Sequence, residues 1–150
     1  MRTRLALIPL SLLCLVAALG TGWAGAVNLV PNGGFEDGAT GWKLGPGVTL
    51  EQGPAAAEGT HYLRCASVDP AVASSATSLP IAVKPRTGYR ARCKFRIEAG
   101  AHYTFGVLNP DGTFFACRDV YGCAIPRWEE SVLPFRTEQQ TQLCLYVARR

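Results

Sequence analysis

The sequence predicts an all-β protein, an antiparallel β-sandwich made of one domain. Apolar and polar residues alternate with a period of two in several segments, most clearly in residues 89–97, and this spacing places one face of a strand against a core. Glycine, proline and aspartate separate these segments at short intervals, as turns between strands require. The only helix-forming stretch, PAAAEG at 54–59, is too short to form a stable helix.

The first 26 residues have the composition of a secretory signal peptide. Arg2 and Arg4 form a basic start, residues 5–19 are largely apolar, and the small residues AGA follow at 24–26. The apolar run of about fifteen residues is short for a membrane span, which needs about twenty. We therefore expect cleavage after this segment, export to the periplasm or the extracellular space, a single mature domain over 27–150 and no membrane span after cleavage.

The mature domain opens with NLVPNGGFEDGATGW at 28–42. Residues 28–30 are expected to form a short strand, followed by a turn at Pro31-Asn32-Gly33. Phe35 is expected to enter the core, and Trp42 is expected to open the next strand as a second core aromatic. This stretch contains no nucleophile or base for catalysis, so it predicts a structural role.

Further strands are expected at 79–83, 89–97, 102–108, 113–117 and 142–147. Asn-Pro-Asp-Gly at 109–112 predicts the turn of a hairpin between two of them. In the strand at 89–97 the apolar side chains share one face, and the other face carries a row of cations: Arg90, Arg92, Lys94 and Arg96.

Charge and cysteine content narrow the class of protein. Without Arg2 and Arg4, 13 basic residues stand against 11 acidic ones, a net charge of +2, which argues against nucleic-acid binding.

Five cysteines remain, so at least one is unpaired or bonded to a partner chain by an intermolecular disulfide. Cys117 and Cys123 are six residues apart, and we expect them to form a disulfide after export. No C-x-x-C spacing occurs, so thiol-bound zinc is not expected.

The opening stretch resembles the start of the carbohydrate-binding modules of families four, nine and twenty-two. EGTHYLRC at 58–65, LPIAVKPRTGYRARCKFRIEAG at 79–100 and WEESVLPFRT at 128–137 are similar to later segments of these modules, in the same order. The resemblance implies a jelly-roll sandwich of the galactose-binding-like type, of the kind appended to secreted polysaccharide hydrolases. Members of these families continue past a strand like QLCLYVARR into a final strand that carries an aspartate, and we expect this strand to be absent here.

The same resemblance implies a structural calcium, with Glu36 as its one securely transferable ligand. The family's other ligands are backbone oxygens and a late aspartate on the missing strand. The alternative is that Glu36 accepts hydrogen bonds from turn amides.

Catalysis is not expected. Glycoside hydrolysis needs two carboxyl groups across a cleft, one of them with a raised pKa, whereas the acidic residues here fall in turns or at strand ends. No G-x-S-x-G nucleophile turn is present. The sequence therefore predicts a non-catalytic protein.

Polysaccharide binding needs aromatic faces for sugar rings and polar groups for hydroxyls. Tyr62, beside Arg64, alternates away from the apolar residues of its strand, and Tyr146 has the same phase in the last strand. Trp42 and Trp128 match family positions that belong to the core.

The row Arg90, Arg92, Lys94 and Arg96 has two interpretations. It is either a solvated outer face that discourages aggregation, or, together with Arg64, a site for an anionic polysaccharide. The resemblance and these residues together predict a secreted, non-catalytic protein that binds a polysaccharide on one face of the sandwich. The alternative is a structural or adhesion domain without a glycan site.

Overall fold

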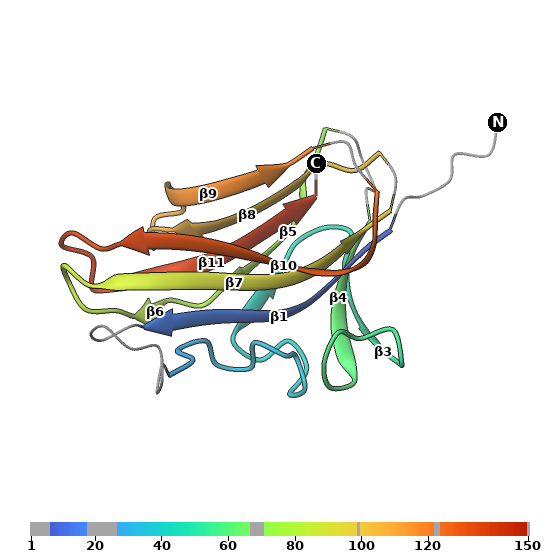
Figure 1. Cartoon of the computed structure of the whole chain (residues 1–150), viewed down its shortest axis with the longest axis horizontal. Coiled ribbons are helices and arrows are strands. Elements are labelled where there is room, and N and C mark those ends of the chain that lie inside the picture. The colour runs from blue at the N-terminus through green and yellow to red at the C-terminus, as the bar shows by residue number, and fades with distance from the viewer. Residues whose placement is uncertain (1–6, 18–26, 67–70, 99, 122–123, 150) are drawn as a thin grey trace.

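Two antiparallel sheets form the fold in a computed structural model of the chain, which describes residues 7–17, 27–66, 71–98, 100–121 and 124–149 (Figure 1). One sheet has five strands, in the spatial order β10 (Ile125–Arg136), β7 (Gly88–Ile97), β1 (Leu7–Ala17), β4 (His61–Ala66) and β3 (Val48–Gln52). The other has six: β2 (Trp42–Leu44), β5 (Ser74–Ser78), β11 (Gln142–Arg149), β8 (Tyr103–Leu108), β9 (Phe114–Val120), and the short β6 (Ile81–Ala82) paired with β11. The described residues include no helix. The predicted all-β antiparallel sandwich is confirmed.

Period-two alternation fixes which face of each sheet is buried. In β7 the residues Tyr89, Ala91, Cys93, Phe95 and Ile97 are all buried, and the side chains between them are half-buried on the opposite face. The strand prediction for 89–97 is therefore confirmed. The hairpin at 109–112 is also confirmed, since the amide of Gly112 donates to the Asn109 carbonyl at 2.9 Å and the strands on either side pair.

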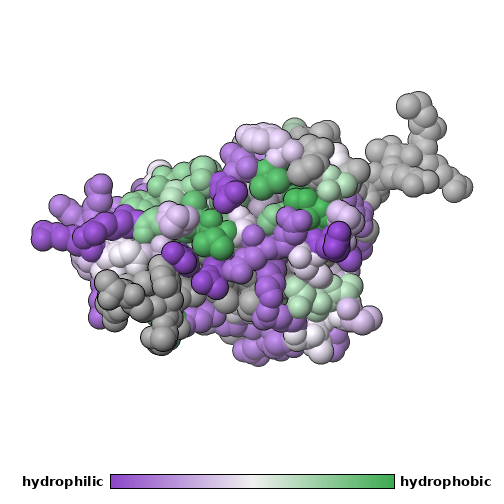
Figure 2. Space-filling model, viewed as in Figure 1, coloured by the Kyte–Doolittle hydropathy of each residue, from purple (hydrophilic) through white to green (hydrophobic). Residues whose placement is uncertain are grey.

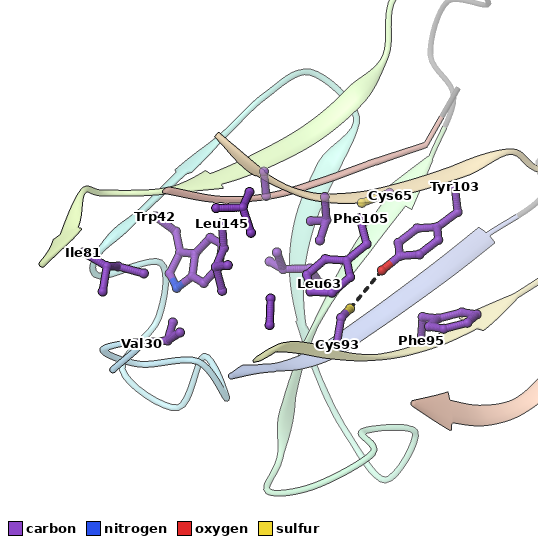
Figure 3. Close-up of a cluster of buried hydrophobic side chains, with 14 of the residues drawn as sticks. Val30, Trp42, Leu63, Cys65, Ile81, Cys93, Phe95, Tyr103, Phe105 and Leu145 are labelled. Carbon is purple, nitrogen blue, oxygen red and sulfur yellow. Dashed lines mark hydrogen bonds between the residues drawn. The ribbon is translucent and has the colours of Figure 1, made fainter. Parts of the chain in front are cut away.

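Large side chains from both sheets fill the space between them (Figure 3). Phe105 and Leu63 are fully buried, and the hydroxyl of the buried Tyr103 donates a hydrogen bond to Cys93 Sγ at 3.1 Å. Phe35 is also fully buried, although its backbone has a positive φ of 61°. Its ring lies 5.1 Å from that of Trp42. Both predicted core aromatics of the opening stretch are confirmed.

The opening stretch differs from expectation in one respect. Residues 28–30 do not form a strand. Among them only Asn28 pairs with another segment, in an isolated bridge. The chain instead passes through turns until Trp42 begins β2, with positive φ angles at Gly38 and Gly41.

The segment predicted to be a signal peptide forms a strand in the full chain. β1 lies in the middle of the five-stranded sheet and pairs antiparallel with β4 through Leu7–Leu10 and with β7 through Leu10–Ala17 (Figure 1). An uncharged apolar run suits both roles, since a central strand and the apolar core of a leader have similar compositions.

Candidate functional site

Six of the predicted site residues lie together on the outer face of the five-stranded sheet. We call this surface the charged face and define it by Tyr62, Arg64, Arg90, Arg92, Lys94 and Arg96. Their neighbours in sequence on β4 and β7 belong to the core, so these six side chains point away from it. Figure 2, drawn from the same side as Figure 1, shows hydrophilic side chains running between hydrophobic patches.

Glu51 on β3 organises one end of the charged face. Its carboxylate accepts a hydrogen bond from the Tyr62 hydroxyl at 2.9 Å and one from Arg64 Nη1 at 2.9 Å. Partial burial opposes ionisation of Glu51, but the hydrogen bonds from Arg64 and Tyr62 outweigh it and hold the Glu51 pKa below its ordinary value. Burial, together with the bond to this carboxylate, raises the pKa of Tyr62. The tyrosine ring is therefore held by its hydroxyl in one orientation.

Carboxylates and an aromatic ring contact the basic row of β7. Lys94 pairs with Glu58 from the loop before β4, and Arg92 Nη1 lies 3.6 Å from Glu130 Oε1 on β10. The guanidinium of Arg96 lies over the Trp128 ring, 5.9 Å from its centre, within reach of a cation–π interaction. The predicted row of cations exists, and the domain supplies its own counter-charges along it.

Trp128 was expected in the core, and that expectation is wrong. Its side chain is half-buried outside the core cluster, and its indole Nε1 donates to the Ala55 carbonyl at 3.0 Å. The cause is local, since the pairing of β10 with β7 is irregular between Ile125 and Glu129. Such an irregularity redirects the side chains within it. Sequence alternation alone could not reveal this second aromatic residue beside Arg96.

Tyr146 does not join this group. It lies on β11 in the other sheet, where its ring meets that of Phe114 edge-on with 5.5 Å between the ring centres. The pair lies beside Gly106, because a Cβ atom at this glycine would come within 3.2 Å of the Phe114 ring. The predicted sugar-binding residues are therefore divided between the outer faces of two opposite sheets.

Glu36, the predicted calcium ligand, has a full set of hydrogen-bond donors. Its Oε1 accepts bonds from the amides of Thr60 at 2.8 Å and His61 at 3.0 Å. Its Oε2 contacts the Thr60 hydroxyl at 2.8 Å and His61 Nδ1 at 3.0 Å. A carboxylate has about four acceptor positions, so the donors use them all. The expectation that turn amides bind Glu36 is confirmed.

The same donors do not suit a cation, because they present hydrogens rather than oxygen lone pairs to the space around the carboxylate. Among the described residues no group of three His, Cys, Asp or Glu side chains could hold a metal ion. Backbone oxygens, which the resemblance implies as further ligands, are not part of such a group, so calcium at Glu36 stays a prediction.

Cys117 is exposed on β9 and has no disulfide partner among the described residues. Cys123, its predicted partner, lies outside the described residues, so this pairing stays a prediction. Cys65 and Cys144 are buried, and burial raises the pKa of the Cys65 thiol to about 12.

Comparison with known proteins does not identify the chain. No model of a known protein family matches it, and no curated protein matches it. No helix in the described ranges is both long enough and apolar enough to cross a membrane.

Proposed function

We propose that the protein is a non-catalytic domain that binds a polysaccharide on the charged face. One observation carries the proposal. Two aromatic rings, Tyr62 and Trp128, lie on the outer side of one sheet together with arginine side chains whose positions are fixed by protein contacts. Exported proteins of this composition meet extracellular glycans, and the resemblance of the opening stretch to carbohydrate-binding modules agrees with this function.

The chemistry of the face suits sugars. The apolar faces of pyranose rings stack on aromatic side chains, and sugar hydroxyls need donors and acceptors side by side. The pair Arg64–Glu51 offers both within 2.9 Å of each other. Because these side chains already hold one another, binding costs little additional side-chain entropy.

A neutral polysaccharide fits this face better than an anionic one. Arg64, Arg92 and Lys94 each have a carboxylate of the same domain beside them. An anionic polymer would compete with these carboxylates, whereas a neutral glycan can bind between the paired groups. We therefore expect binding to change little between 0.1 M and 1 M salt, although screening rises steeply over that range.

Hydrolysis is not part of the proposal. A general acid needs a carboxyl group whose pKa is raised. Hydrogen bonds lower the pKa of Glu36 and Glu51 instead, which keeps both groups ionised at neutral pH.

The test compares Trp128→Ala with Tyr146→Ala for binding to a polysaccharide chosen from a glycan array. Trp128→Ala should weaken binding by roughly tenfold or more, the loss expected for one stacked ring. Tyr146→Ala is the matched control, since this ring lies on the opposite sheet and its removal should leave affinity unchanged. Loss of binding in Tyr146→Ala alone would move the site to the six-stranded sheet.

A second candidate is a structural or adhesion domain without a glycan site. The ion pairs of the charged face favour it, because these groups partly satisfy each other. The array distinguishes the two, since a domain of this kind binds no glycan in either salt condition.

A further inference from the structure

The central strand of the five-stranded sheet, β1, belongs to the segment that the sequence predicts to be cleaved as a signal peptide. β1 separates β4 from β7 and pairs with both. On their other sides β4 pairs with β3, and β7 pairs with β10. Among the described strands only β1 contacts the two facing edges of β4 and β7 through ladder hydrogen bonds.

Removal of residues 1–26 would leave a slot in the sheet. The backbone groups of β7 between Tyr89 and Phe95 would lose their partners along one edge, as would those of β4 between Leu63 and Ala66. Unpaired backbone groups beside a core are costly, and an open strand edge is a template for another strand. Leu63 and Cys93, both fully buried in the full chain, lie next to the slot.

We infer that the exported domain accepts an extended strand of a partner polypeptide in the slot between β4 and β7. The incoming strand runs antiparallel to both neighbours, as β1 does in the full chain. Binding of this kind uses main-chain hydrogen bonds for affinity and alternating side-chain positions for specificity. The inference does not depend on glycan binding.

The neighbours of the slot define the chemistry of the partner strand. Positions opposite Leu63, Cys93 and Phe95 face the core and need apolar residues. Positions opposite Lys94 and Arg92, where the chain's own segment has Ser11 and Cys14, lie on the charged face. The partner is therefore a strand that alternates apolar residues with polar ones. A second exported copy has itself lost the segment LIPLSLLCLVA and cannot supply it, which favours a strand from another polypeptide.

The test uses the full-length chain produced in two ways. Production in the cytosol retains the leader, and production in a secreting host removes it, as the N-terminal sequence of the product verifies. A peptide with the sequence of residues 7–17, with lysines added at its ends for solubility, is then titrated into each protein. We expect it to bind the exported protein with a ratio of one to one and to leave the leader-containing protein unchanged.

Binding should raise the melting temperature of the exported protein by roughly 5–10 °C at a peptide concentration about a hundred times the Kd. It should also slow hydrogen exchange of the β7 amides. A peptide with Ser11→Thr and Cys14→Thr should bind about as tightly, because both changes are polar and fall opposite Lys94 and Arg92, which already have carboxylate partners. A peptide with Leu10→Lys and Leu15→Lys, whose changes fall opposite core residues, should not bind.

Several results would overturn the inference. One is an exported protein that keeps residues 1–26, since the slot then never opens. Another is an exported protein that melts at the same temperature as the leader-containing one and binds none of the peptides. This result would mean that β4 and β7 pair with each other after the leader is removed. Dimers of the exported protein in light scattering would make a second copy the occupant. An unfolded exported protein that neither peptide folds would also contradict it.

Discussion

Glu36 and Asn32 hold the opening loop of the mature domain, each through several hydrogen bonds. The Asn32 amide donates to the carbonyls of Gly38 and Thr40, both at 3.0 Å, and its oxygen accepts the Asp37 amide at 3.0 Å. These bonds close the loop on itself. Glu36 then fastens the loop to the beginning of β4, and bonds of amides to an ionised carboxylate are stronger than those between neutral groups.

Because Glu36 is ionised in the folded protein, the stability of the fold should fall as the pH is lowered. Hydrogen bonds from His61 and Thr60 lower the Glu36 pKa from 4.5 to about 2 in the folded state. A lowered pKa stabilises the fold above the unfolded value, and this contribution is lost as the pH falls from about 4.5 to about 2. In Glu36→Gln the drop of melting temperature over this range should be smaller than in the wild type. Equal acid dependence in both proteins would contradict the assignment.

A side chain at Gly59 should displace the Glu36 carboxylate from its hydrogen-bond donors, because a Cβ atom there would lie 2.3 Å from Glu36 Oε1. Its φ of 64° adds strain for any other residue. Gly59→Ala should therefore cost about 2–4 kcal/mol in the free energy of unfolding, the sum of backbone strain and displacement of the carboxylate.

Gly38→Ala is the matched control for this change. Gly38 has nearly the same φ, 61°, and nothing within 4 Å of the added atom. Gly38→Ala should cost only about 1–2 kcal/mol in the free energy of unfolding, from the backbone strain alone. Denaturant unfolding measures both variants, and equal losses would show that Gly59 makes no special contact with Glu36.

At the scale of elements, alternation predicted β7, β8, β9 and β11 but not β3 or β5, and not what lies across the strands. The burial of β7 follows directly from its sequence, because a period of two admits one buried face. The carboxylates that contact its cations could not be predicted, since Glu58 and Glu130 are remote in sequence from Lys94 and Arg92. Trp128 was misplaced because its core position came from the family resemblance alone, which carries no information about the irregular pairing of β10 with β7 in this chain.

The sequence predicted a core position for Trp42 in the opening stretch, and replacing this residue tests that prediction. The ring is buried to 7% exposure against Phe35, and its Nε1 donates to the Asn32 carbonyl at 3.3 Å. Trp42→Ala should therefore cost about 3–5 kcal/mol in the free energy of unfolding, through the cavity it leaves. A loss below about 1 kcal/mol in denaturant unfolding would contradict a core role.

At the scale of the molecule, the sandwich presents two different outer faces. The five-stranded sheet carries paired charges with Tyr62 and Trp128, and the six-stranded sheet carries the ring pair Phe114–Tyr146 over Gly106. The sequence could assign Tyr62, Tyr146 and the row of cations to the outside of their strands, but not Trp128. It could not assign them to separate sheets, because the pairing of strands distant along the chain decides the sheet.

We expect the disulfide near the connection between β9 and β10. β9 is the last strand of the six-stranded sheet and β10 is the first of the five-stranded one, so the few residues after Val120 pass from one sheet to the other. Cys117 is exposed on β9, and Cys123 follows it by six residues in the sequence. A bond to Cys123 would close a short loop and stabilise the exported protein by roughly 2 kcal/mol through the unfolded state.

Peptide mapping of the exported protein under non-reducing conditions should recover Cys117 and Cys123 linked. Cys123→Ser should lower the free energy of unfolding by the roughly 2 kcal/mol expected for a loop of this length. Adding a reductant should bring the wild type to the level of the variant and leave the variant unchanged, which separates loss of the bond from loss of the side chain. Mapping that finds both thiols free, or Cys117 linked to a second chain, would contradict the pairing and would make the exposed Cys117 a point of attachment to a partner.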